Sequence, residues 1–445
     1  MEKMSKGHVL LIPYPAQGHI NPMLHFCRRL ASKSKSKALK ITFLVLHPKP
    51  LPENLAGGSI TVTTVCGSID NSLSVPDHFT IFKSIMLPKL SEMIEKNDIS
   101  YVVYDSFIPW VLDRAKELGV SGAPLFTQSC AVGNIYCNVY EERLDIHESN
   151  IVLLPGLPTL LNCELPSFLS DSKDYSALGS VIEQFSNLDQ ADCVFYNTFY
   201  SLENEIVNWM ASKWAIKPIG PTIPSMFMDK RLEDDKDYGL SLFKPNSKSC
   251  MEWLDTKEES SVIYISFGSL AVLEEHQMSQ LALGLKGCNR CFLWVVRESE
   301  ETKLPQNFKE ETQGKGLVVH WSPQLEVLAH KSVGCFVTHC GWNSTLEALS
   351  LGVPMVGMPQ WTDQPTNAKF VSDVWGVGVR VKKDEHGIVT KDEIERCISE
   401  VMEGESGDKM RRNCEKWMKI AKMAVDEGGS SDRNIQEFVE KLVCN

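Results

Sequence analysis

The loop His339–Ser344, with sequence HCGWNS, combines side chains suited to binding a phosphate group. It follows an apolar run, Val333–Thr338, that predicts a buried strand, and it precedes a helix expected from about Thr345 to Gly352. An imidazole, an amide, a hydroxyl and a glycine therefore stand directly before the first N–H groups of a helix. Such N–H groups have no partner within the helix and carry a partial positive potential, so they attract anions. The same residues have a second explanation, because Ser344 and Glu347 fit a capping box that needs no ligand.

His19 and Asp105 form a second candidate site, for proton transfer. His19 lies in the loop PAQGHINP after the apolar run Val9–Pro13, and Asp105 ends the run YVVYD. The carboxyl ends of parallel strands meet at one edge of a sheet, where open α/β folds bind ligands. A carboxylate that holds one imidazole nitrogen leaves the other available as a base. The alternative is that His19 is a loop histidine bonded to the backbone.

Alternating strands and helices must position these residues. Helical periodicity predicts a helix from Pro22 to about Ser32, with Asn21 as its N-cap. Strands that alternate with helices indicate parallel sheets covered on both faces. The segments that predict buried strands are Val9–Pro13, Tyr101–Tyr104, Val262–Phe267, Phe292–Val296, Val333–Thr338 and Pro354–Met358.

The chain divides most naturally after a Pro-rich and charged stretch, 218–245, before a new strand–loop–helix pattern begins at Val262. We expect an N-terminal domain over 1–225, a linker over 226–250 and a C-terminal domain over 251–430. The C-terminal helix, 431–445, whose amphipathic pattern runs over 431–443, should pack back on the N-terminal domain.

Composition narrows the class of protein. The 445 residues are enough for two or three domains, and 45 basic against 57 acidic side chains give a net charge of −12. This balance disfavours a nucleic-acid partner. No run of eighteen apolar residues predicts a membrane span, and no secretory signal is evident, so we expect a cytoplasmic protein without stable membrane insertion. The 14 cysteines are then expected to be free thiols.

The 44 positions of Trp321–Gln364 resemble the signature box of the plant UDP-glycosyltransferases, glycosyltransferase family 1. The resemblance extends from PAQGHINP to DEGGSSDRNI. It implies a fold of two doubly wound Rossmann-like domains facing across a cleft, the GT-B type, and a UDP-sugar as donor. The contacts that it implies are Trp321 and Ser322 to uracil, Gln324 and Glu347 to ribose, Ser269, His339, Asn343 and Ser344 to the phosphates, and Trp342, Asp363 and Gln364 to the sugar.

The resemblance also implies a reaction. His19 would remove a proton from an acceptor hydroxyl, Asp105 would orient His19, and the sugar would be transferred with inversion. Thr127 resembles a residue that contacts the donor sugar in relatives. In relatives, a glutamine at the position of Gln364 accompanies UDP-glucose as donor. We expect a monomer that needs no cofactor.

No credible metal site is evident in the sequence. Asp235-Lys236-Asp237 has the Asp-x-Asp form of metal-dependent glycosyltransferases, but it falls in the charged linker, where a solvated surface is expected. The pair Cys288 and Cys291 has no second pair of ligands.

The acceptor is less constrained than the donor. The segment 47–100 is shorter than in typical relatives, and it helps to wall the acceptor pocket; Phe107, Trp110 and Tyr136 are candidate wall residues that could equally be core. Phenolics, terpenoids, steroids and carboxylic acids remain open as acceptors. Two other functions remain as rivals: a nucleotide-dependent oxidoreductase, which lacks a GxGxxG turn here, and a non-catalytic carrier of a UDP-sugar or a lipophilic ligand.

Overall fold

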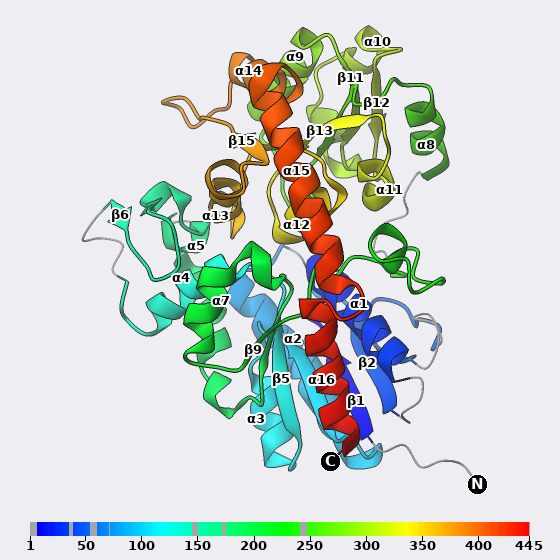
Figure 1. Cartoon of the computed structure of the whole chain (residues 1–445), viewed down its shortest axis with the longest axis vertical. Coiled ribbons are helices and arrows are strands. Elements are labelled where there is room, and N and C mark those ends of the chain that lie inside the picture. The colour runs from blue at the N-terminus through cyan, green and yellow to red at the C-terminus, as the bar shows by residue number, and fades with distance from the viewer. Residues whose placement is uncertain are drawn as a thin grey trace. The chain divides into compact units, whose positions relative to one another are not determined.

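The computed structural model describes residues 7–34, 39–53, 60–70, 72–144, 150–170, 175–240 and 247–444. The chain forms two compact units, each an α/β unit (Figure 1). The first combines residues 1–241 with 421–445, and the second is residues 242–420. The division therefore lies at 241/242 and 420/421, whereas the sequence places the boundaries around a linker at 226–250 and at 430/431.

Within the described residues, seven parallel strands form the sheet of the first unit, in the order β3-β2-β1-β4-β5-β8-β9. Each of the two strands expected here matches an observed strand to within two residues at its ends. The bounds are β1 (Gly7–Ile12), β2 (Leu39–His47), β3 (Ile60–Cys66), β4 (Tyr101–Asp105), β5 (Ser121–Phe126), β8 (Val194–Tyr196) and β9 (Ile216–Pro218).

Helices cover both faces of this sheet. Alternate residues of a strand point to opposite faces, and in β1 the side chains on both faces are apolar and must be buried. Val9 and Leu11 of β1 belong to a core cluster that includes Phe438 of α16, whereas Leu10 and Ile12 belong to a second cluster with Phe82 of α2. The principal helices are α1 (Gln17–Lys33), α2 (Val75–Lys96), α3 (Trp110–Glu117), α4 (Cys130–Tyr140), α6 (Tyr175–Ile182), α7 (Asn204–Ala211) and α16 (Ser430–Cys444).

Helix α1 begins five residues earlier than the sequence pattern predicts. The expected N-cap was Asn21, with Pro22 at the first helical position, but the carbonyl of Ala16 already accepts the N–H of Ile20 at 2.9 Å. Pro22 therefore lies inside the helix. Ile20 is buried in the core of the first unit, so packing of this first turn outweighs the local preference of the residue before a proline for an extended backbone. His19 consequently belongs to the first turn of α1, not to a loop.

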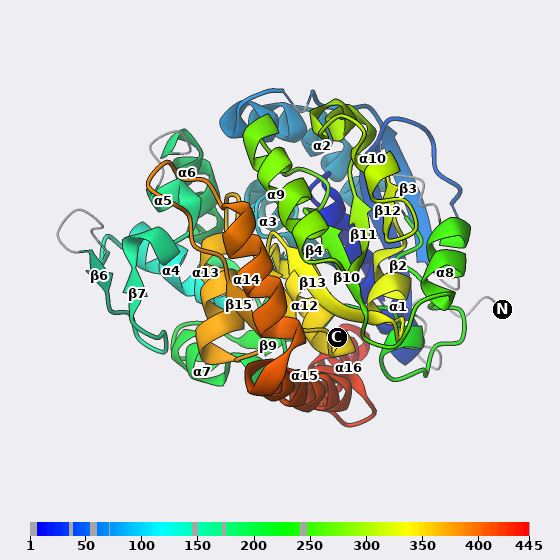
Figure 2. The same cartoon turned by 90° about the horizontal axis from the view of Figure 1, so that it is seen from above.

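The second unit repeats the architecture. Its described strands form a parallel sheet in the order β12-β11-β10-β13-β14-β15, so that the first strand again lies at its centre. Helices α9 and α14 lie side by side on one face (Figure 2), where Ile394 and Leu285 share a core cluster. The bounds are β10 (Val262–Ser266), β11 (Cys291–Val295), β12 (Gly316–Val319), β13 (Val333–Thr338), β14 (Met355–Gly357), β15 (Gly378–Arg380), α8 (Ser247–Asp255), α9 (Glu275–Gly287), α10 (Phe308–Glu311), α11 (Gln324–Leu328), α12 (Trp342–Leu351), α13 (Gln364–Lys369), α14 (Lys391–Met402) and α15 (Gly404–Val425).

The charged segment expected to be a solvated linker is partly buried against α1. Asp235 is 3% exposed, its carboxylate lies 2.8 Å from Nη1 of Arg28, and it accepts the N–H of Ser225. These partners compensate the buried charge. Burial alone would raise the pKa of Asp235, but His25, Ser225 and Arg28 together hold it below its usual range. The expectation of a solvated Asp-x-Asp triplet is therefore wrong for Asp235, although Lys236 and Asp237 are exposed.

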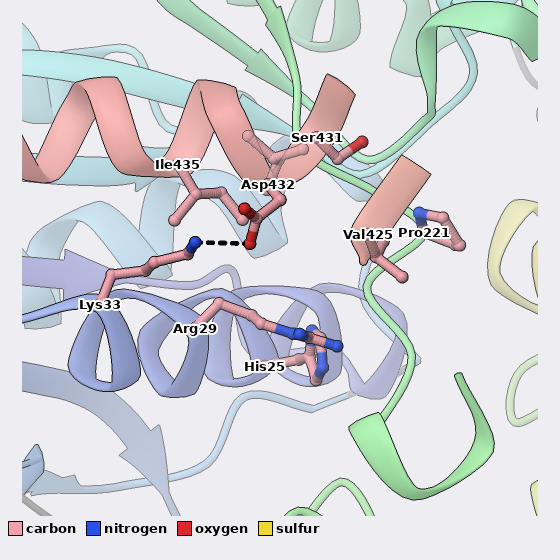
Figure 3. Close-up of a pocket in the computed structure, with 9 residues that line it drawn as sticks. His25, Arg29, Lys33, Pro221, Val425, Ser431, Asp432 and Ile435 are labelled. Atoms are coloured by element: carbon pink, nitrogen blue, oxygen red, sulfur yellow. Dashed lines mark ion pairs between the residues drawn. The ribbon is translucent and has the colours of Figure 1, made fainter. Parts of the chain in front are cut away.

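The C-terminal helix is fastened to α1 by a second set of charges. Figure 3 shows Lys33 of α1 directed at Asp432 of α16, with Nζ and Oδ1 2.6 Å apart. Asp432 also lies 3.2 Å from Nη1 of Arg231 in the charged segment. Beside these groups is a cavity of about 10 Å³, which holds one water molecule at most. The charged segment and the C-terminal helix are thus both tied to α1.

Candidate functional site

Three functional candidates lie at the carboxyl ends of neighbouring strands in the first unit. His19 follows β1, Asp105 is the last residue of β4, and Thr127 comes directly after β5. Since β1 pairs with both β2 and β4 while its chain continues to β2, the order of strands reverses between β1 and β4. Ligands of open α/β sheets bind at such a switch point. The sheet therefore gathers residues that are far apart in the sequence.

The imidazole of His19 is held by a buried carboxylate. Its Nδ1 lies 2.7 Å from Oδ2 of Asp105, and 3.0 Å from the hydroxyl of Thr127. Asp105 is fully buried, whereas His19 is 18% exposed. The second oxygen of Asp105 accepts the N–H of Phe107 at 3.0 Å, so both carboxylate oxygens are engaged. Because the carboxylate accepts a hydrogen from Nδ1, Nε2 is the nitrogen that can take a proton.

Aromatic rings surround His19. The ring centroid of Tyr14 lies 5.3 Å from that of His19, edge-on, and that of Phe107 lies 5.0 Å away. Tyr14 also packs on Phe79 of α2, and its hydroxyl lies 2.5 Å from Nδ1 of His78. The sequence did not single out Tyr14, His78 or Phe79, because an isolated aromatic residue resembles a core residue.

The three candidate wall residues have different environments. Phe107 is half-buried beside His19, and Trp110 is half-buried against Phe82. Tyr136 is 1% exposed and belongs to the core. Phe107 is therefore the one of the three that lies beside the candidate base.

In the second unit, His339 lies between two glycines. A Cβ atom on Gly268 would approach its Nε2 to 2.8 Å, and one on Gly341 would approach it to 2.5 Å. The missing side chains leave room beside this nitrogen for a ligand atom. Nδ1 is buried without a hydrogen-bond partner in the described part of the chain. Burial lowers the pKa of His339 to about 4, so the imidazole is neutral at neutral pH.

Four residues predicted to bind the nucleotide part of the donor belong to one hydrogen-bonded network. Nε2 of Gln324 donates to the hydroxyl of Ser344 at 2.9 Å and to Oε2 of Glu347 at 2.7 Å. The phenol of Tyr264, in the middle of β10, donates to Oε1 of Gln324 at 3.1 Å and lies 2.8 Å from the hydroxyl of Ser322. Since a phenol carries one hydrogen, the hydroxyl of Ser322 is the donor in the second bond. Ser322, Gln324, Ser344 and Glu347 are thus joined in one network, to which Tyr264 also belongs. The sequence analysis did not identify Tyr264.

The capping-box explanation for this loop is wrong. Helix α12 begins at Trp342, its N-cap is Gly341, and no side chain caps it. Ser344 and Glu347 therefore lie inside the helix, bonded to Gln324. The helix starts three residues before the expected Thr345, which places Asn343 and Ser344 in its first turn.

The residues expected at the sugar are strongly constrained. Oε1 of Gln364 accepts the N–H groups of Gln360 and Trp361 at 2.9 and 3.1 Å, which fixes the amide so that its NH₂ group remains a donor. Asp363 occupies the N-cap position of α13, yet its side chain makes no capping bond. Its carboxylate instead accepts from the side chains of Asn367 at 2.7 Å and Thr362 at 2.8 Å. Burial raises the pKa of Asp363.

Trp342 presents its backbone, and not its ring, to Asp363. Its indole is 3% exposed and packs near Trp375, with ring centroids 6.1 Å apart, so the ring belongs to the core. Its backbone N–H is hydrogen-bonded to the carboxylate of Asp363. The position therefore orients Asp363 through the backbone.

The remaining candidates are half-buried: Ser269, Trp321 and Asn343. The carbonyl of Ser269 accepts a hydrogen bond from the guanidinium of Arg297. Within the described residues, no three His, Cys, Asp or Glu side chains are grouped so that they could hold a metal ion. No described cysteine is in a disulfide, although Cys66 and Cys163 are exposed rather than in the core. No described helix is long and apolar enough to cross a membrane.

Comparison with known proteins identifies the family. Residues 200–424 match the family model of UDP-glucoronosyl and UDP-glucosyl transferases. UDP-glycosyltransferase 74E2 of Arabidopsis thaliana is 51% identical over 450 residues, which cover 97% of this chain and 98% of the relative. Among solved structures, Os79 from O. sativa in complex with UDP superposes with a TM-score of 0.88 at 37% identity, covering 98% of this chain and 100% of the other.

A second solved structure is UGT2 of Phytolacca americana, complexed with UDP-2fluoro-glucose and pterostilbene. Its TM-score is 0.83 at 25% identity, with 98% of this chain and 99% of the other covered. The two Rossmann-like units are those of the GT-B fold, and the chain belongs to the plant UDP-glycosyltransferases, glycosyltransferase family 1.

Proposed function

We propose that the protein transfers glucose from UDP-glucose, with inversion of configuration, to a hydroxyl or carboxyl group of a small lipophilic plant metabolite. The observation that carries this proposal is the contact of 2.7 Å between Nδ1 of a partly exposed His19 and a fully buried Asp105. It provides a base whose free nitrogen is Nε2, at the carboxyl edge of a parallel sheet.

In the proposed step, Nε2 of His19 takes the proton of the acceptor hydroxyl. The oxygen attacks the anomeric carbon from the side opposite the diphosphate, the new C–O bond forms, and the bond to the diphosphate breaks with its electron pair leaving on UDP. Asp105 stabilises the imidazolium that forms. General-base assistance of this kind contributes about 10²–10⁴-fold in rate.

The leaving diphosphate would be bound around His339 and the start of α12. The space between Gly268 and Gly341 lies beside Nε2 of His339, and the N-terminus of α12 adds a partial positive potential. Because the imidazole is neutral, it acts as a hydrogen-bond donor rather than as a charge. Ser269 and Asn343 are proposed to complete these contacts, and Trp321 is proposed to stack on uracil.

Glucose is the proposed sugar because of the fixed pair Asp363 and Gln364. The carboxylate of Asp363 accepts hydrogen bonds and the NH₂ group of Gln364 donates them, so together they can match several equatorial hydroxyls. Thr127 is proposed to contact the same sugar, although its hydroxyl also lies 3.0 Å from Nδ1 of His19. The Phytolacca relative, solved with UDP-2fluoro-glucose, supports a glucosyl donor.

The aromatic rings of Tyr14, Phe79 and Phe107 beside His19 support an apolar or aromatic acceptor. Such rings bury the flat apolar face of an acceptor and leave its hydroxyl at the base. The proposal covers phenolics, terpenoids, steroids and carboxylic acids. It assigns no step to a cofactor or metal ion, and it takes the cytoplasm and a monomer as the working state.

The test is an assay with UDP-[¹⁴C]glucose and a mixed panel of aglycones, followed by analysis of labelled products. We expect a labelled glycoside whose anomeric configuration, measured by NMR, is opposite to that of the donor. Retention of configuration would overturn the inverting mechanism. Absence of transfer to any phenolic, terpenoid, steroid or carboxylic acceptor would overturn the proposed substrate class.

A further inference from the structure

Tyr264 lies in the middle of β10, a central strand of the second sheet. Side chains at such positions usually contribute only to the packing of the core. It is fully buried, and its ring stacks on Phe336 of the neighbouring strand β13, with centroids 4.9 Å apart and planes 16° apart. Its hydroxyl nevertheless reaches out of the sheet to the hydroxyl of Ser322 and to the side chain of Gln324, at the start of α11. One oxygen atom thus connects β10 with the start of the signature box Trp321–Gln364, the donor box.

The phenol determines which way the amide of Gln324 faces. Because the phenol donates to Oε1, the NH₂ group must face away from it, and both of its hydrogens are used on Ser344 and Glu347 of α12. The carboxylate of Glu347, which can only accept, favours the same orientation, and the phenolic hydrogen holds the oxygen end of the amide from the other side. A reversed amide would direct its oxygen at the carboxylate of Glu347, and the two would repel.

We propose that Tyr264 is a positioning residue for the nucleoside end of the donor: it fixes Gln324, and through Gln324 it fixes Glu347, the carboxylate that receives the ribose hydroxyls. The proposal rests on the proposed function of the donor box. Tyr264 does not itself touch the donor, since its side chain is completely enclosed. Its contribution is the same in the ground state and in the transition state, so it acts on binding rather than on the chemical step.

The test is Tyr264→Phe, which retains the ring stack and removes one oxygen. We expect the dissociation constant for UDP and the KM for UDP-glucose to rise about tenfold, since two buried hydrogen bonds are lost, and kcat to change less than twofold. UDP affinity is measured by calorimetry, without any reaction. A failed transferase assay would therefore count against the proposed function, and an unchanged UDP affinity would count against Tyr264.

The chain provides a matched control in Tyr196. Its ring also lies on an interior strand, β8, stacked at 16° on Phe126 of the neighbouring strand with centroids 4.5 Å apart, but its hydroxyl has no hydrogen-bond partner in the described residues. Tyr196→Phe should leave UDP affinity within twofold of the parent protein. An equal loss of affinity in both variants would show that removing any buried phenolic oxygen is sufficient, and would overturn the proposal.

A double-mutant cycle separates positioning from general loosening. In the background Gln324→Ala, the residue through which Tyr264 acts is absent, so Tyr264→Phe should change UDP affinity less than twofold. The penalty should also shrink with 2′,3′-dideoxy-UDP, which lacks both ribose hydroxyls. Tenfold losses that persist in the Gln324→Ala background or with the dideoxy ligand would overturn the assignment.

Discussion

The candidate base in the first unit and the donor box in the second unit hold their polar groups in opposite ways. His19 has one carboxylate and one hydroxyl as hydrogen-bonding neighbours and is otherwise surrounded by rings. In the donor box, Gln324 alone makes three hydrogen bonds to neighbours from two different elements, β10 and α12. In the first arrangement, one nitrogen of His19 is the group available for proton transfer. In the second, several hydrogen-bonded side chains would share the binding of the donor.

This difference predicts different sensitivities. A group that acts alone in apolar surroundings has no substitute, so its removal should affect the rate and leave donor binding intact. In a network each member is supported by others, so single changes should affect affinity in moderate steps.

The largest effect is expected for His19→Ala. Transfer should fall by about 10²–10⁴-fold, and the dissociation constant for UDP should stay within twofold, because the donor box lies in the other unit. Steady-state kinetics and calorimetry on the same preparation measure the two quantities. A variant with full activity would remove His19 from the mechanism.

A smaller loss is expected for Asp105→Asn. The amide still accepts the N–H of Phe107, but the charge-assisted bond to His19 is lost. Hydrogen bonds to charged groups contribute about 1.5–3 kcal/mol, equivalent to roughly 10- to 150-fold in kcat. The melting temperature of the variant serves as the control for folding, because Asp105 is fully buried. A loss confined to KM would contradict a role in the chemical step.

The sugar end of the donor box should discriminate between epimers. An axial hydroxyl would leave one partner among Asp363 and Gln364 unpaired, at a cost of about 1–3 kcal/mol. We therefore expect roughly ten- to hundredfold higher kcat/KM for UDP-glucose than for UDP-galactose with one acceptor. Equal use of both donors would show that these residues do not recognise the sugar.

Asp363→Ala should reduce transfer about tenfold or more while leaving UDP affinity nearly unchanged, because a lost buried partner costs about 1–3 kcal/mol. Asp363→Asn is the matched control, since it can keep the bond from Thr362. If UDP binding were lost in both variants, Asp363 would belong to the nucleotide network and not to the sugar end.

The smallest effect is expected for removal of divalent cations. Neither site needs a metal in the proposed step, so EDTA should change the rate less than twofold. Activity is measured before and after chelation and again after addition of Mn²⁺ or Mg²⁺. Loss of activity that these ions restore would show that the reaction requires a metal ion.

The two sites also differ in how far the sequence predicts them. The donor box is almost contiguous, so its residue types and spacing are visible in 44 positions, and the start of α12 was misplaced by only three residues. Tyr264 was missed because a tyrosine between apolar residues resembles any buried strand residue. Its partners Ser322 and Gln324 are 58 and 60 positions away, which no local pattern can connect.

Long-range packing accounts for the errors in the first unit. A proline and a preceding asparagine are typical of a helix start, and only the burial of Ile20 reveals that α1 begins earlier. A run of charges is typical of a solvated segment, and only Arg28 on a distant helix reveals that Asp235 is enclosed. In both cases local preference gave way to a tertiary contact.

The discontinuity of the first unit has a consequence for the order in which the protein folds during synthesis. One face of its sheet is covered by α16, whose Phe438 contacts Tyr101 and Phe195 at ring distances of 5.2 and 4.9 Å. Residues 242–420 are made between the two parts of this unit. At a synthesis rate of roughly 5–20 residues per second, making these residues takes about 10–40 s, during which α16 is absent and this apolar face of the sheet is uncovered. The second unit can therefore be complete on the ribosome while the first, although begun earlier, still presents an open core to chaperones.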